Sequence, residues 1–176
     1  MALAKIFSSA VIGLEAIPIE IEVDTSPGMP FFNIVGLPDK AVEESKDRIN
    51  SAIKNSGLKP PKAQNLRIVV NLAPADIKKK GPFYDLPIAI GYLLATKQID
   101  FDSTDKFFVG ELSLDGSLKH AEGVLPMALM IGDISLSGRG EKSFFIPSSN
   151  SAEASVVKKT NVFGFDKLSD LLLYLK

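Results

Sequence analysis

The feature that most constrains the fold is a change of hydrophobic period after residue 39. Residues Ile17–Val23 alternate apolar and polar side chains, which predicts a strand with one buried face. Residues Lys40–Asn55 place Val42, Ile49 and Ile53 on one stripe and charged side chains elsewhere, which predicts an amphipathic helix. A chain that uses both periods must pack a sheet against helices.

The remaining apolar windows are bounded by glycine- and proline-rich turns and predict further elements. Strands are expected at Ala4–Ile12, Phe31–Val35, Leu66–Leu72, Lys106–Leu112, Ser117–His120, Ser143–Ile146 and Asn161–Phe163. Helices are expected at Leu86–Thr96, Val124–Ile131, Asn150–Lys158 and Lys167–Leu175. The first of these is nearly all apolar and should be buried, with Asp85 as its N-cap. Because several strands precede the first helix, we favour an α+β fold, with mixed sheets and packed helices, over a doubly wound nucleotide fold.

The composition excludes several kinds of chemistry. A length of 176 residues fits a single domain spanning 1–176, and no repeat or linker divides it. The absence of cysteine excludes thiolate metal sites and thiol nucleophiles, and any serine–histidine–carboxylate triad would have to use His120, the one histidine. We interpret His120 as a tolerated surface residue. No metal site or cofactor site is expected in this chain.

The charge balance gives the whole molecule no bulk attraction to nucleic acid or membrane, since 20 basic and 21 acidic residues leave a net charge of −1. No uncharged stretch is long enough to span a bilayer, and Glu15 interrupts the opening segment where a cleaved signal would need apolar residues. We therefore expect a cytoplasmic protein without membrane contact.

The closest approach to a phosphate-binding P-loop is Gly138–Ser143. Its Glu141 would oppose phosphate, and a predicted strand follows where a helix is needed. A solvated turn is the better interpretation, so no ATP site of this type is expected in the chain.

The middle of the sequence is basic, because residues 51–100 carry eight lysine or arginine and three acidic side chains. Three consecutive lysines, Lys78, Lys79 and Lys80, lie in a predicted loop. They could contact a DNA backbone or a partner protein, since lysine–phosphate contacts release counterions. They could equally be a solvated loop, because no aromatic residue is interleaved with them for base stacking.

Several segments, taken together and in order, resemble one family over nearly the whole chain. They are Phe32–Asp39, Glu43–Ile53, Val70–Asp76, Lys80–Gly91, Gly110–Leu118 and Gly123–Pro126. The resemblance is to the N-terminal domain of the YifB/ComM family of magnesium-chelatase-like AAA+ ATPases.

This resemblance implies a fold like the Lon protease catalytic domain and the second domain of ribosomal protein S5. It also implies that an AAA+ module with bound ATP and Mg²⁺ follows downstream, outside this chain. The whole protein would then self-associate into a hexamer, contact DNA and drive branch migration during natural transformation. This chain would be a non-catalytic accessory and assembly domain.

The Lon relationship also implies where a peptidase dyad would stand. Aligning Gly81-Pro82 with the Lon pattern puts Phe83 at the serine position, and aligning Gly110–Gly123 puts Leu125 at the lysine position. Phenyl and isobutyl groups can neither attack a carbonyl nor take up a proton. The resemblance therefore implies that the chain is not an enzyme.

Two alternatives remain open. A displaced dyad could use Ser113 or Ser117 with Lys119, which would make the chain a peptidase. The chain could also belong to a magnesium chelatase ATPase subunit, as the family's description suggests, although no constellation of residues here is suited to a porphyrin.

Overall fold

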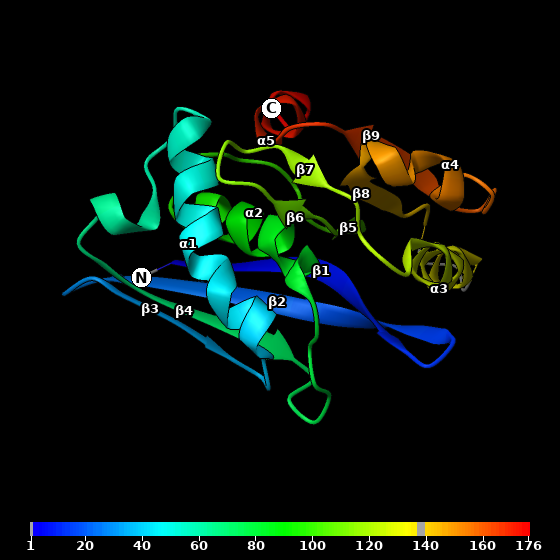
Figure 1. Ribbon diagram of the computed structural model, residues 1–176, viewed down its shortest axis with the longest axis horizontal. Helices are drawn as coiled ribbons and strands as arrows, with labels where there is room; N and C mark the ends of the chain where they lie inside the picture. The colour runs from blue at the N-terminus through cyan, green and yellow to red at the C-terminus, as the bar shows by residue number, and fades with distance from the viewer. Residues whose placement is uncertain (1, 137–139) are drawn as a thin grey trace.

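Seven strands form one mixed sheet in the computed structural model, which describes residues 2–136 and 140–176 (Figure 1). The strand order is β3-β4-β2-β1-β5-β8-β9. The strands are β1 (Ala2–Ile12), β2 (Glu15–Pro27), β3 (Phe31–Val35), β4 (Leu66–Ala73), β5 (Lys106–Phe108), β8 (Ser143–Pro147) and β9 (Asn161–Phe165). The pairs β1/β2 and β2/β4 are antiparallel, whereas β3/β4, β1/β5, β5/β8 and β8/β9 are parallel. This mixed architecture agrees with the expected α+β fold.

Five helices and a small two-stranded ribbon complete the described parts of the chain. The helices are α1 (Lys40–Asn55), α2 (Asp85–Ala95), α3 (Val124–Leu136), α4 (Ser151–Ala154) and α5 (Leu168–Tyr174). The ribbon pairs β6 (Glu111–Leu112) with β7 (Leu118–Lys119). Helices α1 and α2 lie side by side in front of the sheet (Figure 1). The predicted bounds of α1 are confirmed, and so is the burial of α2.

The alternation of side chains along β5 and β8 divides the interior into two cores. Phe108 and Phe145 belong to the larger core, with α1, α2 and α5, and their rings stack at a centroid distance of 4.8 Å. Their neighbours Phe107 and Phe144 point to the opposite face and join α3 and α4 in a smaller core. This half of the sheet is therefore covered on both faces.

Helix α3 and the smaller core cover the second face of β1 and β2 near their hairpin, where Phe7 and Ala16 pack, and the rest of that face is open to solvent. On the open part Lys5 forms ion pairs with Glu20 at 2.8 Å and with Glu22 at 3.2 Å, and Glu22 also accepts a hydrogen bond from Asn71. The period-two pattern of Ile17–Val23 predicted this arrangement, which is typical of antiparallel strands with one solvated face.

The prediction of one continuous strand over Lys106–Leu112 is wrong, because Val109 and Gly110 interrupt the strand and separate β5 from β6. Gly110 donates its N–H to Phe83 and accepts one from Leu86, so its backbone pairs with the start of α2. A Cβ on Gly110 would lie 3.0 Å from the Leu118 side chain. The break is therefore the point where the ribbon β6/β7 leaves the sheet to pack on α2.

Other element bounds also differ from the sequence-based prediction. Helix α3 runs on to Leu136, five residues further than expected, whereas the predicted helix Asn150–Lys158 is reduced to the single turn α4. No helix in residues 2–136 or 140–176 has the length and apolar character that a bilayer span requires.

Candidate functional site

The loop between β4 and α2 is built around a buried lysine. Lys79 is fully buried, and its ammonium donates a hydrogen bond to the Pro74 carbonyl. Its backbone donates to Leu37 and accepts from Asp39, which fastens the loop to the segment before α1. Burial lowers the pKa of Lys79. Lys79 therefore holds the loop together, which corrects the expectation that it offers its charge to DNA or a partner.

Lys78 and Lys80 are the exposed lysines of this loop. The three lysines predicted as one basic patch are thus separated by the structure into two surface cations and one internal support. Lys78 and Lys80 are therefore the two lysines of this loop whose ammonium groups are accessible to a phosphate or carboxylate.

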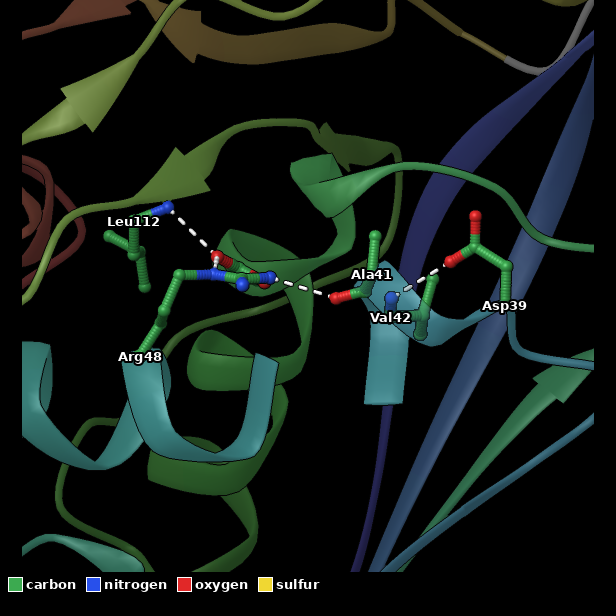
Figure 2. A network of polar contacts seen from close by, with 6 residues as sticks. Asp39, Ala41, Val42, Arg48 and Leu112 are labelled. Atoms are coloured by element: carbon green, nitrogen blue, oxygen red, sulfur yellow. Dashed lines mark hydrogen bonds and ion pairs between the residues drawn. The ribbon is translucent and has the colours of Figure 1, made fainter. Parts of the chain in front are cut away.

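Asp39 joins the same loop to the first turn of α1. One carboxylate oxygen caps the helix by accepting the Val42 N–H at 2.9 Å, which Figure 2 shows, and the other accepts the Gly81 N–H at 3.1 Å. A side chain that caps one element and anchors another fixes their relative position. The loop and the short turn after it are therefore held against α1.

Beside this loop lie two cavities of about 630 and 370 Å³ that share Lys80, Phe83 and Glu122. We call them together the Phe83 groove. The β1–β2 hairpin supplies Ala10–Gly13 to the wall of the larger cavity, whereas Glu111 and His120 line the smaller one. The groove thus lies where the loop, the hairpin and the start of α3 meet.

The charged side chains that line the Phe83 groove are of both signs. They are the lysines Lys78 and Lys80 and the carboxylates of Asp76, Glu111 and Glu122. Three carboxylates against two ammonium groups give the groove no net attraction for a phosphate backbone.

The two residues at the Lon dyad positions are placed differently. Phe83 lines the groove, packs against both cores and lies 4.5 Å from the Tyr84 ring. Leu125 lies on α3, is 37% exposed and is not among the residues that line the groove, although Gly123 is. The Leu125 backbone N–H donates to the Glu153 carboxylate at 2.9 Å. The structure therefore brings Phe83, but not the Leu125 side chain, to the groove.

The serines of the alternative dyad take part in a turn. The Ser117 hydroxyl donates to the Asp115 carboxylate at 2.9 Å, and the Ser117 carbonyl accepts the Ser113 N–H at 2.9 Å. Among the described residues no hydrogen bond joins either serine hydroxyl to Lys119, which is exposed. This geometry pairs the Ser117 hydroxyl with the Asp115 carboxylate of the same turn and not with Lys119.

A buried ion pair joins α1 to the start of α2, next to the turn that carries Phe83. The Arg48 guanidinium contacts both oxygens of the buried Asp85 carboxylate, at 2.6 and 2.9 Å, and also donates to the Ala41 carbonyl at 2.9 Å. Asp85 accepts the Leu112 N–H as well, at 3.1 Å. Figure 2 shows the dashed line of this hydrogen bond leaving Leu112. The prediction that Asp85 caps α2 is wrong: Tyr84 occupies the cap position, and the Asp85 carboxylate points to α1 and β6.

Burial raises the pKa of Asp85 to about 6, although Arg48 and the Leu112 N–H act in the opposite direction. The carboxylate is therefore ionised at neutral pH, where it pairs with Arg48. The Arg48 pKa is raised by the same pair.

Comparison with known proteins decides the family. A family model described as subunit ChlI of Mg-chelatase matches residues 21–150. The competence protein ComM of Haemophilus influenzae is 41% identical over 176 residues, and the protein YifB of Salmonella typhimurium is 37% identical over 177. The chain belongs to the YifB/ComM family of magnesium-chelatase-like proteins.

The two relatives named above are longer than this chain. The alignments cover 99% and 100% of the chain but 33% of the H. influenzae ComM and 33% of the S. typhimurium YifB. The chain therefore spans about a third of the length of these relatives.

Some features of this YifB/ComM family member were accessible to sequence reasoning and others were not. His120 is exposed, as expected. In Gly138–Ser143, residues 138 and 139 lie outside the described residues, and Lys142 is buried and pairs with Asp105. Asp39 was missed, although an aspartate directly before a helical pattern is a known cap signal.

Proposed function

We propose that this chain is the non-catalytic, Lon-like accessory domain of a YifB/ComM-type ATPase. The observation that carries the proposal is that Phe83 lines the Phe83 groove. The Lon resemblance assigns this position to the nucleophile, and a phenyl ring cannot act as one. Leu125 at the second dyad position has no group that could accept a proton. Family membership supports the assignment, because the chain aligns with its relatives over almost its full length.

In this proposal the hydrolysis of ATP with Mg²⁺ belongs to an AAA+ module in the rest of the polypeptide, which assembles as a hexamer. The accessory domain contributes subunit contacts and a surface for DNA. The name of the H. influenzae relative, a competence protein, supports a role in natural transformation, where the motor would drive branch migration of recombining strands.

The DNA surface of the accessory domain is proposed to be the outside of the loop that carries Lys78 and Lys80. The Phe83 groove itself is unsuited to DNA, because Asp76, Glu111 and Glu122 line it. A strand of DNA that followed the loop would contact the two exposed ammonium groups, and the exposed Asp76 carboxylate of the same loop would weaken this contact.

The double variant Lys78→Ala/Lys80→Ala is expected to bind DNA roughly tenfold more weakly than the wild type. The plot of its log binding constant against log salt concentration should also be less steep by about two, because each lysine–phosphate contact contributes about one to the steepness. Fluorescence anisotropy with labelled duplex and single-stranded DNA over a salt series measures both quantities. The matched control is Lys158→Ala/Lys159→Ala, which removes two exposed lysines from another part of the surface. Equal losses in both double variants would refute a specific role for the loop.

A further inference from the structure

Over its first two turns helix α3 is apolar on its outer side as well as on its inner side, and the exposed Asp133 follows on the outer side. Val124, Met127 and Ile131 are buried in the smaller core. Leu125 and Leu129 are 37% and 51% exposed, and their spacing of four residues aligns them in one ridge. A helix that is hydrophobic all round is normally covered on all sides.

The tip of the β1–β2 hairpin extends this apolar surface. Leu14 is 94% exposed and lines the cavity beside α3, whereas Ile12, which is 51% exposed, lines the Phe83 groove. Turns at hairpin tips usually carry polar residues, so a fully exposed leucine here is unfavourable for an isolated surface. Contiguous exposed apolar side chains of this kind mark an interaction site.

Between the hairpin and α3 lies a cavity of about 600 Å³, which we call the α3 groove. Its apolar walls include Leu14, Pro126 and Leu129. Among the residues that the structure describes, the charged side chains that line it are Glu15 and Asp133, both exposed and both acidic. A ligand that fills the groove must therefore be apolar on one side and basic at its edge.

We propose that the α3 groove binds an amphipathic helix of a partner protein, with leucine-like side chains four residues apart and lysine or arginine beside them. Leu129 lines the groove, and Leu125, one turn earlier on the helix and outside the groove lining, forms a ridge with it that suits a second helix, because ridges of residues spaced by four interlock when helices cross. Glu15 and Asp133 would pair with the basic residues. The same carboxylates repel nucleic acid and the anionic surface of a membrane.

Two helical peptides test this directly. Both carry leucines at i, i+4 spacing, one with flanking lysines and the other with glutamates in their place. By fluorescence anisotropy the lysine peptide is expected to bind and the glutamate peptide to bind roughly tenfold more weakly or not at all. Equal binding of the two peptides, or no binding of the lysine peptide, would overturn the proposal.

Three variants locate the site. Leu129→Asp is expected to weaken the binding of the lysine peptide roughly tenfold or more, since it places a charge in the apolar wall of the groove. Leu173→Asp, a change at a 69% exposed leucine on α5, should leave the affinity unchanged. Asp133→Lys should weaken the binding of the lysine peptide and strengthen the binding of the glutamate peptide. Loss of folding cannot produce this exchange of preference.

Two other occupants give distinct results. A wild-type dimer in sedimentation velocity that Leu129→Asp dissociates would assign the groove to a second copy of the chain and overturn the proposal. Binding to phosphatidylglycerol vesicles that Leu129→Asp abolishes would assign the groove to a membrane, with the same consequence. A monomer that ignores vesicles and binds the lysine peptide supports the proposal.

Discussion

The Arg48→Met variant is expected to lose roughly 3–5 kcal/mol of unfolding free energy, because removing one partner of a buried ion pair leaves an uncompensated charge. The remaining charge would be the carboxylate of Asp85, whose side chain is fully buried, whereas the Arg48 side chain is 20% exposed. Methionine fills much of the volume of the arginine stem, so the loss reports on the charge more than on a cavity. Urea denaturation followed by circular dichroism measures it.

Adding Asp85→Asn to Arg48→Met should recover part of this loss. Asparagine is neutral and keeps an oxygen that can accept the Leu112 N–H, now donated at 3.1 Å to Asp85. The double variant is therefore expected to be more stable than Arg48→Met alone. A double variant that is less stable than both single variants would contradict the pairing that we describe.

The loss in Arg48→Met should also depend on pH. In the wild type burial raises the pKa of Asp85 to about 6, and removing Arg48 raises it further, since Arg48 lowers it. At a pH above the pKa of Asp85 in the variant, the variant shows the full loss of unfolding free energy relative to the wild type. As the pH falls through that pKa towards about 6, the loss becomes smaller, because protonation of Asp85 removes the buried charge. Stability of the variant relative to the wild type should therefore be better at about pH 5 than at about pH 8.

The Gly36→Ala variant is expected to lose about 3 kcal/mol or more of unfolding free energy, since backbone strain and a steric clash act at the same position. Gly36 has a φ of +96°, which L-residues rarely adopt, and a Cβ there would lie 2.2 Å from the Leu72 carbonyl oxygen. The contact is with backbone in a central strand, so it cannot be relieved by a change of rotamer. Guanidinium denaturation gives the loss.

Gly57→Ala is the matched control for Gly36→Ala. Gly57 also has a positive φ, +79°, but a Cβ there would meet no atom within 4 Å. It should therefore show only the conformational cost, about 1–2 kcal/mol. Similar losses in the two variants would mean that the approach of Gly36 to Leu72 has no steric role. A larger loss in Gly36→Ala would show that it does.

Local patterns predicted the elements whose own residues determine them. The stripe of Val42, Ile49 and Ile53 fixed the position of α1 because these side chains share one face, and all three are fully buried. The apolar run of α2 likewise predicted its burial. Such periodicity needs no knowledge of the rest of the fold.

The features that sequence reasoning missed depend on residues far apart in the chain. Asp85 suited the role of a helix cap, but Arg48 lies 37 positions earlier and reaches it only because α1 and α2 pack together. The burial of Lys79 follows from backbone pairing with Leu37 and Asp39, which nothing within the three lysines indicates. The break at Gly110 likewise depends on the approach of Phe83 and Leu118.

A non-catalytic domain should contain no activated serine nucleophile. Incubation with a fluorophosphonate probe followed by intact-protein mass spectrometry detects one, since the probe forms a stable adduct with such a hydroxyl. We predict no adduct, in the wild type as in a Ser113→Ala/Ser117→Ala variant. A single stoichiometric adduct on Ser113 or Ser117, lost in that variant, would contradict the assignment of a non-catalytic domain.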